Sequence, residues 1–228
     1  MNTFDEIPAN LPLSEQVEIR IRDAITSGRM TPNVIYTETS IAEQMRVSRT
    51  PVREAVMNLA SRGFVTVLPR RGFQVRIFSK KSIHDVYDLR WALESHAVRT
   101  LSANPEKYDL SVLARAAEQQ KESAIRSEIN GAVSSGRDFH HELLHLTGNS
   151  MVDRVFEDIR DIISVTWSQA FTHSISAIDV ASDHMHLVDL IKKGESDSAC
   201  ALLKEHLQRS EKAVLEAQRK TEKQYREG

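Results

Sequence analysis

The heptapeptide SRTPVRE at residues 48–54 constrains the fold more than any other stretch of the chain. Proline is accepted in the first turn of a helix, where its missing N–H costs no hydrogen bond. Ser48 stands at the N-cap position, where its hydroxyl can accept a bond from a free backbone N–H. A helix is therefore predicted to begin here, with Arg49 and Arg53 exposed near its N-terminus. A helix-turn-helix recognition helix faces the major groove in this way; a capped surface helix with two solvated arginines is the alternative.

The flanking segments favour the first interpretation, because they predict a winged helix-turn-helix. Apolar residues recur at helical spacing over residues 13–27, and a second, short helix is expected to end at Met45. Two β-prone runs, residues 64–68 and 73–77, follow the helix that begins at Ser48. The turn between them holds a glycine and two arginines, so a β-hairpin with a basic tip is predicted.

The charge of the chain is concentrated in this region. The formal net charge is −2, yet the segment from Arg46 to Arg76 contains seven arginines and a single acidic residue, Glu54. This distribution indicates one domain that contacts an anion and one that does not. The single cysteine, Cys200, excludes an intramolecular disulfide. No apolar run suggests a signal peptide or a membrane span, so we expect a cytoplasmic protein.

The remainder of the chain is predicted to be helical. Helices are expected over residues 83–101, 110–127, 139–146, 151–171, 176–193 and 196–218, and Asn130-Gly131 is expected to break the second. About 150 residues in six helices are enough for an independent bundle. The predicted fold is therefore mainly α. It consists of a winged helix-turn-helix of three helices and a β-hairpin in residues 1–78, a linker at 79–82 and an all-α six-helix bundle in residues 83–228.

The N-terminal motifs resemble those of GntR-family transcription regulators. The matching motifs are Ile25-x-x-Gly28, Ile41-Ala42-Glu43-Gln44, residues 47–55 and residues 69–75, and they recur in order over residues 13–78. The resemblance implies a homodimer on a palindromic DNA operator, with one winged helix for each half-site. The residues expected to bind DNA are Arg49 and Arg53 at base edges or nearby phosphates, Ser48, Thr50 and Glu38 as positioning groups, and Arg70, Arg71 and Gly72 in the wing.

The helical half resembles the FCD ligand-binding domain of the FadR subfamily, in its smaller VanR-like group of six helices. The resemblance is carried by residues 87–94, Phe139-His140 with Gly148-Asn149, Asp183-His184, and Ala199 with His206-Leu207. In that domain three histidines and an aspartate bind a divalent metal, and the histidines correspond to His140, His184 and His206. Spacing alone would leave these three as independent histidines on three different helices.

The aspartate of that pattern is missing here. It should lie four residues before the first histidine, one helical turn away on the same face, and that position is Gly136. Asp138 would point to the opposite side of a regular helix. Three imidazoles with open positions still suit Zn²⁺ best, with Ni²⁺ and Mn²⁺ as alternatives. Water or an effector carboxylate would complete the metal's shell.

The resemblance also implies an effector site and a function. The family's arginine at position 90 faces the pocket, where Arg90 can clamp the carboxylate of an acidic effector; a surface arginine paired with Glu94 is the alternative. We expect a ligand-responsive regulator, a repressor released by a small acidic metabolite, and alternatively a regulator whose effector is the metal itself. An enzyme is not expected, because no acid–base pair accompanies the histidines.

Overall fold

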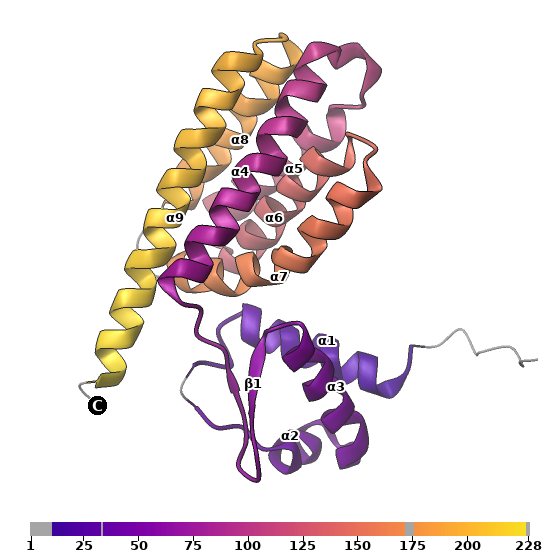
Figure 1. Cartoon of the computed structure of the whole chain (residues 1–228), viewed down its shortest axis with the longest axis vertical. Coiled ribbons are helices and arrows are strands. Elements are labelled where there is room, and N and C mark those ends of the chain that lie inside the picture. Colours follow the sequence, from indigo (N-terminus) through magenta and orange to yellow (C-terminus); the bar gives the residue numbers. More distant parts are fainter. Residues whose placement is uncertain (1–10, 33, 172–175, 227–228) are drawn as a thin grey trace, which may run out of the picture. The chain divides into compact units, whose positions relative to one another are not determined.

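The computed structural model of the chain describes residues 11–32, 34–171 and 176–226 (Figure 1). It forms two compact units, Met1–Arg76 and Ile77–Gly228. The first ten residues of the expected DNA-binding domain and the last two of the expected helical domain lie outside the described residues. The mainly α fold is confirmed, with one small β-hairpin among the described residues. In the same residues no helix is long and apolar enough to cross a membrane.

The N-terminal unit is a winged helix-turn-helix. Its elements are α1 (Leu13–Thr26), α2 (Glu38–Met45), α3 (Arg49–Ser61), β1 (Val65–Leu68) and β2 (Gly72–Val75). α1 packs against α3. Their interface is apolar, because helical spacing places the apolar residues of each helix on one face. The buried residues are Val17 and Ile21 of α1 and Val52, Val56 and Leu59 of α3. β1 and β2 pair antiparallel from Val65↔Val75 to Leu68↔Gly72, which leaves residues 69–71 as the tip.

The turn from α2 to α3 is set by backbone geometry. Thr37 caps α2, because its Oγ1 accepts a hydrogen bond from Ser40 N at 3.1 Å. Arg46 ends α2 in the left-handed conformation, with φ of 54°. Ser48 has the expected N-cap backbone before α3, but its hydroxyl makes no capping bond. The prediction of a side-chain cap was therefore wrong, and the exposed hydroxyl is available to an external partner.

Gly72 is required by a close backbone approach. Tyr36 N donates to Phe73 O and Phe73 N donates to Tyr36 O, each at 2.9 Å. These two bonds bring the segment before α2 against the hairpin. A Cβ on Gly72 would lie 2.1 Å from Tyr36 O, and its φ of +124° is a region that L-residues rarely adopt. The residue with positive φ at the tip itself is Arg70, at 63°.

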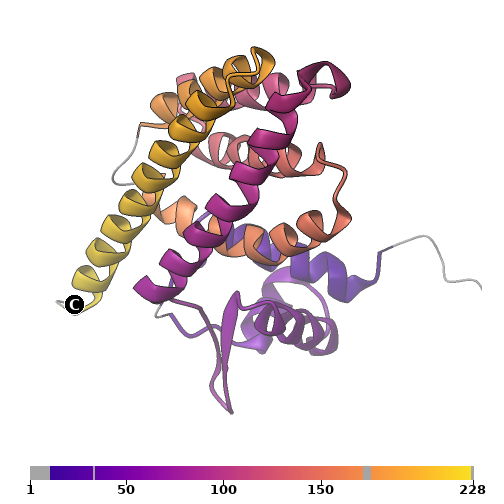
Figure 2. The same ribbon diagram turned by 45° about the horizontal axis from the view of Figure 1, so that its top comes forward.

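The C-terminal unit is a helical bundle. Its elements are α4 (Lys80–Ala103), the short 3₁₀-helix η1 (Pro105–Lys107), α5 (Ser111–Ile125), α6 (Ile129–His145), α7 (Ser150–Phe171), α8 (Ala177–Lys192) and α9 (Ser196–Arg226). α4 and α9 run side by side (Figures 1 and 2), and α5 packs against both α6 and α8. Residues 80–82, which we expected in the linker, form the first turn of α4, where Ser79 Oγ accepts from Ser82 N at 3.0 Å.

α6 begins well before the expected Phe139. The chain reverses at residues 126–128, where Ser127 has φ of 59°, whereas Asn130-Gly131 lies inside the helix. The expected break at Asn130-Gly131 was therefore wrong. Glycine weakens a helix by about 1 kcal/mol, but here it lets α6 approach α5. A Cβ on Gly131 would lie 2.8 Å from Ser123 Oγ, and one on Gly136 would lie 2.4 Å from Gln120 Nε2.

The substitution Gly72→Ala should loosen the hairpin. Its Cβ would force the Tyr36 carbonyl away, so we expect faster hydrogen exchange of the Tyr36 and Phe73 amides, measured by mass spectrometry on the full chain. Gly28→Ala is the matched control, because Gly28 also has positive φ but no atom lies within 4 Å of its Cβ position. Equal exchange in the two variants would contradict the steric requirement at Gly72.

Candidate functional site

The exposed face of α3 begins with the predicted recognition residues. Arg49, Thr50 and Arg53 are exposed, whereas Pro51 and Val52 between them are buried. Arg49 is 69% exposed in its side chain, and its Nη2 lies 3.7 Å from Glu38 Oε2 at the start of α2. Such a distant, exposed ion pair contributes little stability. Glu38 therefore orients the guanidinium without holding it away from solvent.

The wing presents two further arginines. Arg70 and Arg71 are exposed at the tip between β1 and β2. Neither makes an ion pair with any residue that the structure describes. Gly72 owes its conformation to the contact with Tyr36, so its part in the wing is to permit the fold. The start of α3 and the wing tip thus each present two exposed arginines.

The three predicted histidines meet inside the helical unit. His140 comes from α6, His184 from α8 and His206 from α9, and all three are buried. One ring nitrogen of each lies within 4.8 Å of the others. The Nε2 atoms of His184 and His206 are 3.3 Å apart. The ring of Phe139 stacks on His184 with centroids 4.1 Å apart, which fixes that imidazole further.

Each of these histidines is oriented by a hydrogen bond at its other nitrogen, Nδ1. The acceptors are Glu94 Oε2 for His140 (2.9 Å), Gln120 Oε1 for His184 (2.6 Å) and Asp183 Oδ2 for His206 (3.1 Å). Carboxylate and amide oxygens accept hydrogen bonds, so in each pair Nδ1 carries the proton. The lone pairs of all three Nε2 atoms are consequently free. Ligating histidines in metal sites are oriented in this way.

Burial keeps two of the imidazoles neutral. Desolvation lowers the pKa of His140 well below its usual range, and the positive charge of Arg90 lowers it further. Desolvation also lowers the pKa of His184, with contributions from the other two histidines and Arg90. Burial raises the pKa of Glu94, and the charge and hydrogen bond of Arg90 oppose this rise. Neutral imidazole is the form that binds metal, so no proton has to be displaced at these two ligands.

The residues present fit a divalent metal. Two lone pairs 3.3 Å apart, as on His184 and His206, repel each other unless a cation or proton lies between them. Zinc–nitrogen bonds of 2.0–2.1 Å in a tetrahedral shell place neighbouring nitrogens about 3.3 Å apart. The adjoining cavity, lined by Gln120, Gly136 and the histidines, has a volume of about 30 Å³. That volume accommodates an ion and one water-sized ligand.

The structure contains no α6 carboxylate at this centre. Gly136 lies one turn before His140 in a continuous helix, on the cavity side. Asp138 is exposed and accepts two hydrogen bonds from Arg137, at 3.1 and 3.2 Å. Sequence reasoning missed the roles of Glu94, Gln120 and Asp183. Asp183 was quoted only as part of a motif, and Gln120 has no local signal at all, because its partner is distant in sequence.

Arg90 matches neither of its two expected environments in full. It is paired with Glu94, as in the surface alternative, but it is only 1% exposed. Arg90 Nε donates to Glu94 Oε1 at 2.7 Å, and the guanidinium lies over the Tyr87 ring at 5.3 Å. Its buried Nη2 has no hydrogen-bond partner within the described part of the chain. Arg90 thus supports Glu94, which in turn orients His140, and keeps one donor available.

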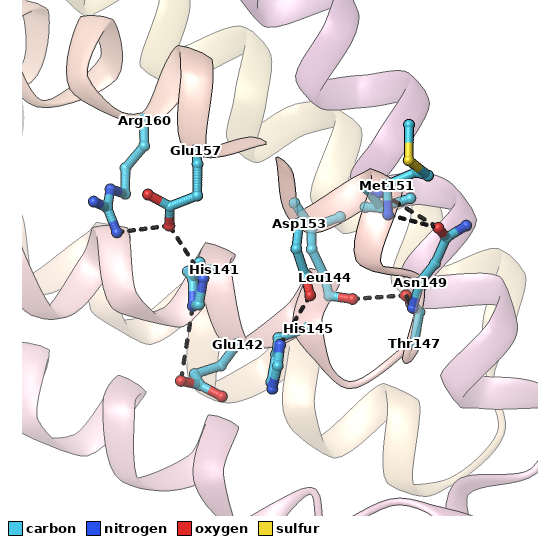
Figure 3. Close-up of polar contacts among 11 residues, drawn as sticks. His141, Glu142, Leu144, His145, Thr147, Asn149, Met151, Asp153, Glu157 and Arg160 are labelled. Atoms are coloured by element: carbon cyan, nitrogen blue, oxygen red, sulfur yellow. Dashed lines mark hydrogen bonds and ion pairs between the residues drawn. The ribbon is translucent and has the colours of Figure 1, made fainter. Parts of the chain in front are cut away.

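A second histidine pattern on α6 faces α7. Residues 141–145 read His-Glu-Leu-Leu-His, the H-E-x-x-H spacing of zinc proteases. Figure 3 shows that the two histidines contact separate carboxylates: His141 Nε2 lies 3.3 Å from Glu157 Oε1, and His145 Nδ1 lies 3.0 Å from Asp153 Oδ2. They do not converge on one point. The pair therefore ties α6 to α7, and the pattern is not used as a catalytic zinc site.

The two units thus define a DNA-binding regulator with a buried polar centre in its helical domain, and comparison with known proteins gives the family. Residues 13–75 match the bacterial regulatory proteins of the gntR family, and residues 85–209 match the FCD domain. The chain belongs to the GntR family and carries an FCD domain. GntR regulators bind DNA through the helix-turn-helix domain, and FCD domains bind small-molecule effectors.

Individual relatives agree with this assignment. The Nta operon transcriptional regulator of Aminobacter aminovorans is 29% identical over 196 residues, covering 81% of this chain and 86% of that protein. A GntR transcriptional regulator from Rhodococcus sp. RHA1 has the same fold, with a TM-score of 0.79 at 24% identity over 90% of this chain and 98% of that one. The relatives are named as transcriptional regulators, and this protein is not an enzyme.

The stability of the metal-free protein should fall as the pH falls below about 6.5. The unfolded chain takes up protons at His140 and His184 there, whereas the folded chain, whose pKa values are lowered, does not. Each histidine then lowers the free energy of unfolding by up to about 1.4 kcal/mol per pH unit. Urea unfolding between pH 7 and 5, in the presence of a chelator, measures this slope. The double variant His140→Gln/His184→Gln should flatten it.

The exposed His96 of α4 supplies the control for loss of a histidine from the same unit. His96→Gln should keep the wild-type slope. A double variant with the slope of the wild type would contradict the neutral, buried state of the two ligands.

Proposed function

We propose that this protein is a cytoplasmic transcription repressor of the VanR-like group of the FadR subfamily. It binds a palindromic operator as a homodimer and is released when a small acidic metabolite binds, through a divalent metal, at the three-histidine centre. The observation that carries the effector half of this proposal is the common orientation of His140, His184 and His206. Each donates its Nδ1 proton outward to a carboxylate or amide oxygen and turns its Nε2 lone pair inward.

On the DNA side, Arg49 and Arg53 contact base edges or the adjacent phosphates. Arginine pairs bidentately with guanine, and both side chains are exposed at the N-terminal end of α3. Ser48 and Thr50 contact the sugar-phosphate backbone, and Glu38 positions Arg49. The wing, with Arg70, Arg71 and the conformation permitted by Gly72, reaches the minor groove or phosphates.

Arg49→Ala should abolish specific operator binding while the protein stays folded. The operator is first selected from random DNA with the wild type, and affinity is then measured by gel shift at one fixed salt concentration. Arg115→Ala is the control, because it removes the same charge from an exposed position on α5. We expect a loss of at least about tenfold for Arg49→Ala only, since a bidentate base contact contributes about 1–3 kcal/mol. Unchanged operator affinity would refute the assignment.

In the helical domain, His140, His184 and His206 hold the metal, most readily Zn²⁺, with Ni²⁺ or Mn²⁺ as alternatives. The metal supplies a positive centre that takes an anionic oxygen. A hollow of about 270 Å³ between α8 and α9 shares His206 and Val180 with the small cavity, so it offers room for the body of a metabolite. Arg90 Nη2, buried and unpaired in the described residues, is the donor for a second effector oxygen.

Effector binding acts by population shift. The effector binds one arrangement of the dimer more tightly than the other, and this difference in affinity supplies the coupling to DNA binding.

Elemental mass spectrometry should find about one divalent metal per chain in untagged protein. His184→Ala should lose that metal, because it removes one of three neutral nitrogen ligands. His96→Ala, which removes an exposed histidine, should retain it. The absence of metal from the wild type, even after incubation with Zn²⁺, would refute the metal centre.

The second candidate function is a regulator whose effector is the metal itself. The small volume of the cavity at the histidines, about 30 Å³, favours it, because an ion and one water fill that space. Operator affinity that follows the metal concentration without any metabolite would support this alternative. Operator release that requires a carboxylate at constant metal concentration would support the metabolite-responsive regulator.

A further inference from the structure

Gln120 of α5 reaches the three-histidine centre on the side where the family pattern has a carboxylate. Its side chain is buried and lines the cavity together with Gly136. Its Oε1 accepts the Nδ1 proton of His184 at 2.6 Å. Because the carbonyl end of the amide is held by His184, the other end, Nε2 with its two N–H donors, faces Gly136.

This amide occupies the space that a side chain at position 136 would need. A Cβ on Gly136 would lie 2.4 Å from Gln120 Nε2 and 3.1 Å from its Cδ. An aspartate at 136 and Gln120 in this conformation therefore exclude each other. Position 136 lies one turn before His140 on the same face of α6. Gln120 Nε2 consequently stands where the side chain of an aspartate ligand would begin.

Within the described part of the chain, Gln120 takes part in one side-chain hydrogen bond, the one that its Oε1 accepts from His184 Nδ1, and its Nε2 takes part in none. Gln120 lines the cavity, so its amide donors can reach an acceptor placed there. An N–H group cannot ligate a metal, but it can donate to an atom that the metal binds. The cavity beside it is the place for such an acceptor.

The charges around the centre require that acceptor to be an anion. Three neutral imidazoles leave the charge of a divalent metal uncompensated. Among the described side chains, the carboxylates bonded to the histidines are already paired, Glu94 with Arg90 and Asp183 with Arg209. A buried charge without a counter-charge is strongly unfavourable. Since the described part of the chain supplies no further carboxylate there, the counter-charge comes from solution.

We propose that Gln120 Nε2 donates a hydrogen bond to an exogenous carboxylate bound at the metal, and so selects an anionic ligand over a neutral one. Where the family pattern has a built-in anionic ligand at position 136, this chain has a donor that faces the incoming ligand. The inference rests on the metal centre of the proposed function. A hydrogen bond to a charged acceptor contributes about ten- to hundredfold in affinity.

The full-length protein loaded with Co²⁺ provides the test, because the visible absorption of Co²⁺ reports its coordination shell. Acetate is titrated as the probe, beside acetamide as its neutral analogue. Gln120→Glu keeps an oxygen acceptor for His184 Nδ1, removes the N–H donor and adds a negative charge. Gln119→Glu adds the same charge at the exposed neighbouring position on α5 and is the matched control.

We expect acetate to bind the wild type and Gln119→Glu alike, and more tightly than acetamide does. Gln120→Glu should still bind Co²⁺, with acetate affinity lower by at least about tenfold. This combination supports the proposal, because a residue that only orients His184 would change metal affinity instead.

Three results would overturn the inference. Wild-type acetate affinity in Gln120→Glu, or equal binding of acetate and acetamide to the wild type, would do so and leave the metal centre intact. Loss of Co²⁺ from Gln120→Glu would confine Gln120 to orienting His184. A wild type that takes up no Co²⁺ would overturn the inference together with the proposed metal centre.

Discussion

The hydrogen bonds at the Nδ1 atoms of the three buried histidines are the interactions on which the helical unit's site depends. Without an acceptor at each Nδ1, the rings would have no reason to turn their Nε2 lone pairs toward one point. The acceptors Glu94 and Gln120 come from α4 and α5, helices that contribute no histidine. The centre therefore exists only when five helices are packed together. A ligand bound at this centre would contact a site whose geometry depends on the packing of those helices.

The buried pair of Arg90 and Glu94 supports this arrangement at a cost in desolvation. Leucines at positions 90 and 94 could fill the same space, but His140 Nδ1 would then have no acceptor on α4. Arg90 and Glu94 are four residues apart on one helix, so a local contact neutralises the Glu94 carboxylate. The same carboxylate accepts the hydrogen bond of His140, which is distant in sequence. The buried charge of Glu94 orients His140, and the buried ion pair is weak evidence that the fold gains stability there. The basic groups of the N-terminal unit, by contrast, stay exposed at the start of α3 and in the wing.

Local signals predicted the fold well because they act over a few residues. Pro51 and the N-cap position of Ser48 set the start of α3. The β-prone runs at residues 64–68 and 73–77, with a glycine in the turn between them, predicted the hairpin. The same logic failed at Asn130-Gly131, which has the composition of a break but lies inside α6. There the close packing of α6 on α5 outweighs the low helix propensity of glycine. It also failed for the hydroxyl of Ser48, since the N-cap backbone forms without the side-chain bond.

The sequence by itself determined the order of the elements, the basic face of α3 and the wing, and, through its resemblance to a family, which three histidines to consider. It did so because helix starts, β-prone runs and charge are properties of neighbouring residues. Only the tertiary structure decided that His140, His184 and His206 meet, and that Gln120 occupies the space beside Gly136. It also decided that Arg90 is buried against Glu94 rather than exposed. Those facts depend on contacts between residues far apart in the chain, which no local pattern encodes.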